Sequence, residues 1–424
     1  MGEEAYVISD LHVGSGAGDP LDDFLDDDLF AGFVRSHAKD DVTLVINGDF
    51  VDFAQIEPLD VSAVPADRLW DEDVSVQKLE SALRGHPVCF AALGDFLSRG
   101  GHLTIVIGNH DFDLAWPRVQ QRLRDQWAVR ADQVDFVIGA ASYHGVHIEH
   151  GYQFSPENCP ADPVAFIHRC DQGGQSRELL ERVWGTDFLL RFFNDLERRH
   201  PYIDNVKPTV WVAWQGLKQG WIPKSELVHL AIFLKRNMPW RPIASLMDIE
   251  DGGGAVLAQS FAESEWQELV VEALNTASGD VEEAISALSP DDKAVLARPV
   301  AVSIGEELAL GERGKTMRLL RPGSREQAWA RKRLAGPAVT HVVFGHTHQI
   351  VNGNSPDATL PGLFNPGSWI PHLDLRDPAI AEKIKARGVT LELLDDTSLY
   401  RMDPYAVRIK PGPMRSWVEL VRCS

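Results

Sequence analysis

The sequence predicts an α/β protein in which helices cover layers of buried strands. Short, β-branched, apolar segments recur along the chain, and segments with a helical spacing of apolar residues lie between several of them. Five of the apolar segments end directly in aspartate, asparagine or histidine residues. The first two features predict the fold class, and the third indicates where a functional site would lie.

The composition is that of a globular protein of substantial size. The chain has 424 residues, 44% hydrophobic and 24% charged, enough for one large core with an insertion or for two or three small domains. With 41 Lys and Arg against 62 Asp and Glu, the formal net charge is −21. This charge argues against a nucleic-acid backbone as the main partner, although a local basic patch could override it. The sequence indicates no oligomeric state.

Several features bear on the cellular location. Four cysteines without CxxC spacing indicate neither a disulfide framework nor a zinc site, and they fit a reducing compartment. The first residues, MGEEAYVIS, enter a strand-like segment too soon for a secretion signal. No apolar run approaches the roughly 18 to 20 residues needed to span a bilayer. We therefore expect a cytoplasmic protein without a transmembrane segment.

The strands and helices of the first 150 residues follow from periodicity. AYVIS, VTLVI, LTIVI and VHIE are typical of strands buried on both faces. Residues 21 to 34 place Leu21, Leu25, Leu29 and Phe33 on one helical face, so the aspartates between them form a solvated surface rather than a metal loop. Residues 74 to 85 predict a second helix.

Side chains that can bind metal follow five apolar segments. The carboxyl ends of parallel strands meet along one edge of an α/β sheet, so these side chains can converge although they are far apart in sequence. A lone histidine near a strand end is usually just solvated or hydrogen-bonded, but five such segments are not explained by chance. The side chains are those of Asp10, His12, Asp49, Asp52, Asn109, His110, Asp111, His150, His346 and His348.

The chemistry of these side chains fits a metal site. Oxygen and imidazole ligands without thiolate suit Mn, Fe, Zn, Co or Ni, and a bridging carboxylate can hold two ions about 3.5 to 4 Å apart. A glycine precedes a ligand in three of the segments, at Gly48, Gly108 and Gly345. Each of these glycines permits a tight turn and a close approach of the backbone to the site.

The five segments together resemble the calcineurin-like metallophosphoesterases. The motifs D-x-H, G-D-x-x-D, G-N-H-D, H-G and G-H-T-H occur in this order as DLH, GDFVD, GNHD, HG and GHTH, and NPGSW follows at 365 to 369. The resemblance covers residues 1 to about 155 and about 337 to 400. It implies a four-layer αββα sandwich, in which two stacked sheets are flanked by helices.

The resemblance also implies which residues hold metal. We expect two divalent ions and favour Mn, with Fe, Zn, Ni or Co as the alternatives. Asp49 would bridge the ions. The first ion would be held by Asp10, His12, Asp49 and His348, and the second by Asp49, Asn109, His150 and His346.

The implied activity is hydrolysis of a phosphoester substrate by a phosphatase or phosphodiesterase with a metal-bound hydroxide, which attacks phosphorus in line. His110, which is not a ligand in this family, is implied to protonate the leaving oxygen or to stabilise the phosphoryl charge, with Asp111 orienting it. We expect Asp52 to accept a hydrogen bond from a neighbouring residue rather than to bind metal.

Residues 156 to 336 predict a mostly helical insertion. The evidence is a series of helix-like stretches at 177 to 199, 225 to 237, 263 to 275 and 324 to 336. We expect it to form a cap over the metal site. For its tryptophans we favour core packing over a substrate-stacking or lipid-facing platform. A basic run at 312 to 333 is typical of a solvated helix face, with a phosphate contact as the alternative. The tryptophans are Trp184, Trp211, Trp214, Trp221 and Trp240.

The domain organisation follows from these assignments. Residues 1 to 155 and 337 to 424 would form the two parts of a metallophosphoesterase core, interrupted by the insertion at 156 to 336. Near the C-terminus, VTLELL, YAVRIK and WVELV predict strands that complete a second sheet.

Two alternative functions stay open. The UDP-diacylglucosamine hydrolases, which cleave a pyrophosphate bond, are similar in motif layout and in having a helical insertion, but they usually carry arginine where this chain has His110. Phosphodiesterases and protein phosphatases keep the histidine. A non-catalytic scaffold on the same fold would lack ligands or His110, and here none is missing. No residue pattern decides between monoesters and diesters.

Overall fold

The structure is a computed structural model that describes residues 4–58, 64, 68–155, 158–172, 175–207, 286, 290, 293, 324–375, 377–387, 390–413 and 416–423. The chain divides into two compact units. The first comprises Met1–Asn205, Arg325–Leu373 and Asp396–Ser424, and the second comprises Val206–Ser324 and Asp374–Asp395. All five motifs belong to the first unit, together with both ends of the segment that the sequence assigns to the insertion.

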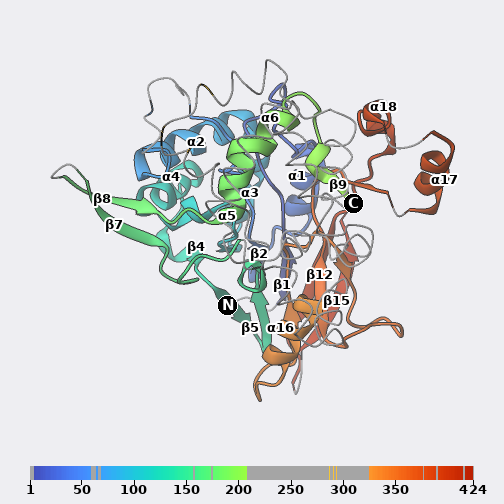
Figure 1. Cartoon of the computed structure of the whole chain (residues 1–424). Coiled ribbons are helices and arrows are strands. Elements are labelled where there is room, and N and C mark those ends of the chain that lie inside the picture. Colours follow the sequence, from blue (N-terminus) through green and yellow to red (C-terminus); the bar gives the residue numbers. More distant parts are fainter. Residues whose placement is uncertain are drawn as a thin grey trace, which may run out of the picture. The chain divides into compact units, whose positions relative to one another are not determined.

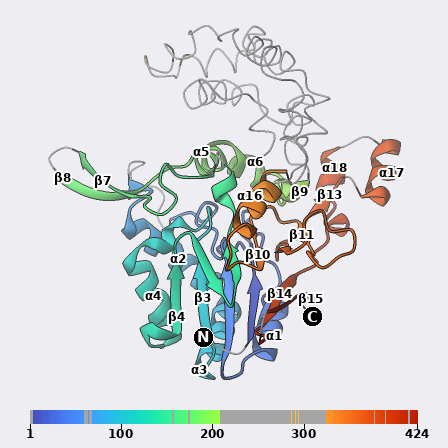
Figure 2. The same ribbon diagram turned by 90° about the horizontal axis from the view of Figure 1, so that it is seen from below.

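The first sheet of this unit has six strands in the order β15-β14-β1-β2-β3-β4. Strands β1 (Glu4–Ile8), β2 (Val42–Asn47), β3 (His102–Val106) and β4 (Val134–Val137) are parallel to one another. Strands β14 (Tyr405–Lys410) and β15 (Trp417–Arg422) extend it in antiparallel pairing (Figure 2). Our expectation that these two complete a second sheet was wrong, because alternation along a strand does not say which sheet the strand joins.

The second sheet has five strands in the order β11-β12-β10-β6-β5. Strand β10 (His341–Val343) is parallel to both β6 (Val146–Glu149) and β12 (Leu363–Pro366). Strands β5 (Ala140–Tyr143) and β11 (Ile350–Val351) are its antiparallel edges. The five motif strands are therefore divided between two sheets, three in the first and two in the second.

Alternation along β1 assigns its side chains to two cores. Tyr6 and Ile8 belong to a core that also holds Phe30 and Phe90 of the helices. Ala5 and Val7 belong to a second core, shared with Ile148, Val343 and Phe364 of the second sheet. The first sheet thus buries one face against helices and the other against the second sheet (Figure 1).

Four helices lie on the first sheet, namely α1 (Asp27–Ser36), α2 (Glu72–Gly85), α3 (Pro87–Ser98) and α4 (Pro117–Trp127). The sequence predicted two of them, α1 and α2, the first with a shifted start. The helix expected over residues 21 to 34 begins only at Asp27, because Asp26 caps it by accepting a hydrogen bond from the Leu29 amide at 2.8 Å. Leu25 consequently lies outside the helix and is 53% exposed.

The described beginning of the predicted insertion is not helical throughout. Strands β7 (Ile167–Gln172) and β8 (Gln175–Leu180) form an antiparallel hairpin where the expected helix would start (Figure 1). A π-helical turn, Leu189–Phe193, then joins α5 (Trp184–Phe188) to α6 (Asn194–Glu197). The remaining stretches, with Trp211, Trp214, Trp221 and Trp240 and the expected cap itself, lie outside the described residues.

Short elements complete the described chain. The 3₁₀ helices of the first unit are Phe112–Ala115, Ala131–Gln133, Tyr152–Phe154, Ile203–Asn205 and Thr397–Leu399. In the second unit, α17 spans Pro378–Arg387 and α18 spans Leu391–Leu394. Strands β9 (Val206–Lys207) and β13 (Leu373–Asp374) have two residues each. The strand expected at VTLELL is wrong, because Thr390 caps α18 by accepting from the Leu393 amide.

Helix α16 (Ser324–Leu334) confirms the last predicted helix of the insertion. Its Ala330 is fully buried against Val342, Phe344 and Leu363 of the second sheet. Cys89, Cys159, Cys170 and Cys423 are all free thiols. Among the described helices, none combines the length and the hydropathy required to cross a membrane.

Helix α16 also buries a carboxyl group, which leads to a stability prediction. Glu326 is 4% exposed, and burial raises its pKa from the ordinary 4.5 to about 7, against a hydrogen bond donated by Asn365. Below pH 4.5 the carboxyl group therefore does not lower the free energy of unfolding. As the pH rises from 4.5 to about 7, the folded protein loses stability, because the buried group resists the ionisation that the unfolded chain undergoes. At pH 8 we expect Glu326→Gln to raise the free energy of unfolding by up to about 3 kcal/mol.

Urea denaturation of both proteins at pH 4.5 and pH 8 measures this effect. The gain should be present at pH 8 and nearly absent at pH 4.5, because the wild-type carboxyl is then neutral in the folded state and only half ionised in the unfolded state. Glu392→Gln is the matched control, since Glu392 is exposed on α18. Equal gains for the variant at both pH values would contradict the assignment.

Candidate metal centre

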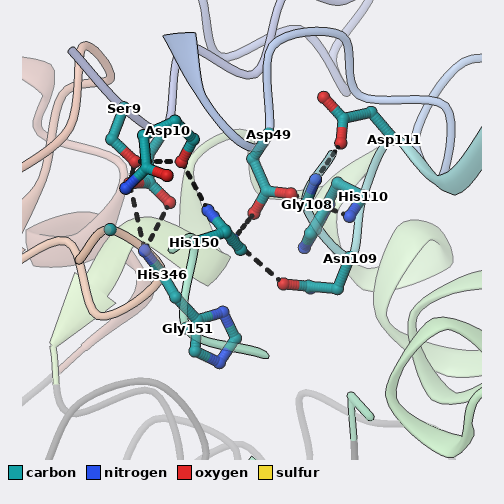
Figure 3. Close-up of polar contacts among 12 residues, drawn as sticks. Ser9, Asp10, Asp49, Gly108, Asn109, His110, Asp111, His150, Gly151 and His346 are labelled. Carbon is teal, nitrogen blue, oxygen red and sulfur yellow. Dashed lines mark hydrogen bonds and ion pairs between the residues drawn. The ribbon is translucent and has the colours of Figure 1, made fainter. Parts of the chain in front are cut away.

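The loops that follow five strands bring the predicted ligands together. The ligand atoms of Asp10, His12 and His348 all lie within 4.8 Å of one another, and those of Asp49, His150 and His346 do the same. A third, overlapping group consists of His12, Asp49 and His110. Figure 3 shows several of these side chains turned toward one another from loops of both sheets. The residues that the sequence singled out thus form one continuous cluster.

Backbone hydrogen bonds hold these loops against each other beyond the ends of the strands. The amides of Asp10 and His12 donate to the carbonyls of Gly48 and Asp49, at 3.1 and 2.9 Å. In the second sheet, the Gly345 amide donates to the His150 carbonyl at 2.8 Å. The ligand-bearing loops are therefore fixed relative to one another before any metal binds.

The backbone of the cluster is strained at its ligands. Nine non-glycine residues of the described chain have a positive φ, and five of them are the predicted ligands Asp10, His12, Asp49, His346 and His348. This left-handed conformation is disfavoured for residues with a Cβ atom, and it persists only where the surroundings impose it. Its concentration at one cluster is the pattern found at functional sites.

The glycines before the ligands have no room for a side chain, as the sequence predicted. A Cβ atom on Gly108 would lie 2.2 Å from Asp49 Oδ1, and one on Gly345 would lie 1.9 Å from Ser9 Oγ. On Gly48, which has a φ of +84°, a Cβ atom would lie 2.1 Å from His150 Nδ1. Glycine at these positions lets two loops share the space around the ligands.

Gly108→Ala should therefore damage the site, because a Cβ atom there also lies 2.5 Å from the backbone nitrogen of Asp49. The new methyl group displaces the Asp49 carboxylate, and a shift of about 1 Å in a catalytic group can lower turnover on the order of 100-fold. Metal affinity and turnover of the purified variant measure the effect. Gly32→Ala is the control, because nothing lies within 4 Å of its Cβ position. Unchanged metal affinity in Gly108→Ala would contradict the prediction.

Hydrogen bonds to Nδ1 decide which nitrogen of His12 and His150 faces the cluster. Nδ1 of His12 lies 2.8 Å from Asp52 Oδ2, and Nδ1 of His150 lies 2.7 Å from the Asn47 carbonyl oxygen. A carboxylate and a carbonyl accept hydrogen bonds, so Nδ1 donates in both cases. Nε2 of each ring is left for a metal, an arrangement that is usual for histidine ligands.

Asp49 lies between the two groups of ligands. Its Oδ2 atom is 3.1 Å from His150 Nε2 and 3.9 Å from His12 Nε2. Its Oδ1 atom accepts a hydrogen bond from the His110 amide at 2.9 Å. One carboxylate oxygen thus faces a histidine of each group, which is the geometry that a bridging ligand requires.

The donor set around Asp10 and His348 fits a divalent cation. Nε2 of His348 lies 3.2 Å from Nε2 of His12 and 3.4 Å from Asp10 Oδ1, so three donor atoms face a common point. Nδ1 of His348 is buried and has no hydrogen-bond partner among the described residues. In the other group, Asn109 Oδ1 lies 3.2 Å from His150 Nε2 and adds an oxygen donor.

The charges of the proposed ligands stabilise one another within the cluster. Burial would lower the pKa of His150, but the Asp49 carboxylate outweighs it and raises that pKa to about 9. Burial would likewise raise the pKa of Asp49, but His150 and His110 hold it well below its usual range. A metal must therefore displace a proton from His150, so metal affinity should fall as the pH falls below about 9.

Asp52, and not Asp111 as we expected, orients the His110 ring. Nδ1 of His110 lies 2.9 Å from Asp52 Oδ2, the same oxygen that accepts from His12. The expectation that Asp52 accepts a hydrogen bond from a neighbouring residue is confirmed. The two oxygens of Asp111 instead accept from the amides of Phe50 and Gly108, and burial, followed by repulsion from Asp49, raises its pKa to about 7. Asp111 fixes two loops rather than the His110 ring.

The segment NPGSW supports the last motif. The Asn365 side chain donates to the Gly345 carbonyl at 2.9 Å and to Thr347 Oγ1 at 3.0 Å. The Trp369 amide donates to the Asp10 carbonyl at 3.0 Å. These contacts tie the loop that carries His346 and His348 to the loop after β1.

Sequence reasoning missed Ser9 and Asn47 as supporting residues. Ser9 Oγ donates to the Asn47 carbonyl at 2.8 Å and also contacts Asp10, whereas Asn47 receives the Nδ1 hydrogen of His150. Their only sequence signal is that each lies within two residues of a ligand. One residue of the predicted basic run, Arg333, has a structural role. Its guanidinium group pairs with the buried Glu149 carboxylate at 2.9 Å.

A search of protein-family models finds none that matches the chain, and a search of curated proteins finds no match either.

Proposed function

We propose that this chain is a calcineurin-like metallophosphoesterase, a hydrolase that cleaves phosphoester bonds with the help of two divalent metal ions. The observation that carries the proposal is the position of Asp49, whose Oδ2 atom faces a histidine of each ligand group, at 3.1 and 3.9 Å. Acidic and imidazole donors around a shared carboxylate are typical of two-metal hydrolysis. The order and spacing of the five motifs point the same way.

The core clusters support the finer fold that the resemblance implies. One core lies between helices and the first sheet, a second between the two sheets, and a third between the second sheet and α16. We propose that this order of cores corresponds to an αββα sandwich, with the metal centre where the strand ends of the two sheets meet.

In this proposal, Asp10, His12 and His348 hold one ion, His150, His346 and Asn109 hold the other, and Asp49 bridges them. Bound ions would acidify a water molecule and offset the charge that develops on the phosphoryl oxygens. Mn is the favoured metal, with Fe, Zn, Ni or Co as alternatives, because the donors are imidazole, carboxylate and amide groups without thiolate.

His110 has the position of a general acid for the leaving oxygen. Asp52 holds Nδ1 of the ring at 2.9 Å, so Nε2 is the nitrogen that can deliver a proton to a substrate. Asp52 also keeps the ring next to His12, with 4.7 Å between the ring centroids. The Asp52 carboxylate stays ionised to support both rings, because the two histidines outweigh burial and lower its pKa.

The experiment that tests the proposal is hydrolysis of two chromogenic esters, 4-nitrophenyl phosphate and bis(4-nitrophenyl) phosphate. The protein is assayed after metal stripping and again after Mn is added back. We expect turnover only with metal, and the ratio of the two rates identifies monoester or diester preference. Equal turnover before and after stripping would contradict a metal-dependent mechanism, and bound Mn without turnover of either ester would favour a scaffold.

A further inference from the structure

A pocket opens beside the metal centre on the side of Asn109 and His110. The space in and above it, open solvent included, measures about 350 Å³, and both of these residues line it. Most of the remaining wall is apolar and comes from Phe53, Trp70, Phe112 and Leu180. Since His110 is the proposed acid for the leaving oxygen, the pocket is where the leaving group of a substrate would lie.

One residue of this wall does not fit a purely apolar pocket. Lys78 is 5% exposed, and it is the only Lys or Arg among the residues that line the pocket. It occupies the apolar stripe of α2, four residues after Val74 and four before Ala82, both of which are buried. A lysine in this stripe carries its ammonium group inside the protein rather than at the surface.

The Lys78 ammonium is only partly satisfied by the protein. Nζ donates one hydrogen bond, to the Phe53 carbonyl oxygen at 2.7 Å, although an ammonium has three donors. Within the described part of the chain, no carboxylate oxygen lies within 4.0 Å of this nitrogen. The two carboxylates that line the pocket have hydrogen-bond or ion-pair partners. Asp113 accepts a hydrogen bond from Ser75, and Glu181 pairs with His168.

Asp113, Asp52 and Glu57 act on Lys78 only from beyond ion-pair distance. Burying a charge without a directly paired counter-charge is costly, and a ligand that brings a negative group into contact with it lowers that cost. Burial lowers the pKa of Lys78, so an anionic ligand would also favour its protonated form. Phe53, whose carbonyl receives the lysine hydrogen bond, follows Asp52 and donates its own amide to the His110 carbonyl at 3.1 Å. The lysine is thus placed next to the proposed acid without belonging to the metal ligands.

We propose that this pocket is a leaving-group subsite, in which Lys78 binds an anionic substituent carried by a flat, apolar leaving group. The inference rests on the proposed function and adds a substrate class to it, namely esters whose leaving group combines an aromatic or similarly flat body with a negative charge. The apolar walls take the body, and Lys78 discriminates between charged and uncharged substituents.

Three aryl phosphates with the same ring test the subsite. They are phenyl phosphate, 3-carbamoylphenyl phosphate and 3-carboxyphenyl phosphate, which compare no substituent, a neutral one and a charged one of nearly the same shape. Phosphate release by the Mn-loaded protein is measured for each. We expect kcat/KM for the carboxylate to exceed that for the carbamoyl ester by about tenfold or more, mostly through KM, because both substituents can accept a hydrogen bond from Lys78 but only the carboxylate supplies a counter-charge.

Lys78→Gln should abolish this preference, whereas Lys78→Arg should keep part of it because the charge is retained. Lys39→Gln, at an exposed lysine between α1 and β2, controls for a general loss of positive charge. A Lys78→Gln protein that loses activity on all three esters equally would show that the lysine only supports the Phe53 loop, and this would overturn the inference. So would a wild-type protein without preference for the carboxylate.

The outcomes separate the inference from the proposed function. Turnover of all three esters without discrimination removes only the subsite. Turnover of bis(4-nitrophenyl) phosphate without turnover of the three monoesters also removes only the subsite. Absence of turnover of these esters and of both nitrophenyl esters by the metal-loaded protein removes the proposed function and the subsite with it. Should Lys78→Gln fail to fold, the comparison of the carbamoyl and carboxylate esters in the wild-type protein still decides the question.

Discussion

His110→Ala should lower turnover by about 10²- to 10⁴-fold, because this is the usual contribution of a positioned general acid. The metal content should stay unchanged. Asp52 fixes the ring through Nδ1 at 2.9 Å, and His110 lines the pocket beside the metal centre. Removing the ring takes away the proton donor but none of the proposed ligands.

The measurement is kcat together with bound Mn per chain, determined on the same preparation. His102→Ala is the control, because His102 is exposed at the start of β3. Since His12, Asp49 and His110 also form a group within ligand distance, loss of one Mn in His110→Ala would reassign His110 as a ligand. Unchanged turnover would remove it from the reaction altogether.

Asp49→Asn should have the largest effect of any single substitution. The variant keeps the size of the side chain but loses the charge that faces His150 at 3.1 Å and His12 at 3.9 Å. We expect less than two Mn per chain and a loss of turnover of more than about 10³-fold, since several kcal/mol of charge stabilisation depends on the ions.

Asp135→Asn is the matched control for this variant, because Asp135 is exposed on β4. Bound Mn and turnover are again measured together, and circular dichroism shows whether the fold is kept. Two tightly bound Mn ions in Asp49→Asn, with near-normal turnover, would mean that another group bridges the ions or that they are held independently.

The sequence predicted the strands that carry the site because their signal is local. The segments around β1, β2, β3, β6 and β10 are apolar, and each ends in the residue types that a metal needs. Which sheet each strand joins is not local information. Tyr405–Lys410 has the same alternation whether it pairs with β1 or extends the other sheet, and only the long-range pairing of Ala5 with Ile409 decides it.

Other features depended on competition between signals. Residues 177 to 180 have helical composition, yet pairing of Ile167 with Leu180 draws them into a hairpin. In VTLELL the β-branched start suggested a strand, but the Thr390 cap starts a helix. The choice of Asp52 rather than Asp111 as partner of His110 depends on loop geometry. Asp111 directly follows the histidine in the sequence, whereas Asp52 lies 58 residues away and meets the ring only in the fold.

Lys78 also shows what a sequence pattern can and cannot predict. Its spacing with Val74 and Ala82 marks it as a residue of the buried stripe, and that signal is visible in the sequence. What it faces is not visible, since the pocket is built from residues as distant as Phe53, His110 and Leu180.

The measurement that tests the central claim most directly is titration of the metal-stripped protein with Mn, during which bound Mn and phosphoester hydrolysis are followed together. The account predicts that two Mn ions bind per chain and that hydrolysis appears only as they bind. Hydrolysis by the stripped protein, or a protein that binds no Mn or other divalent metal at these ligands, would contradict it.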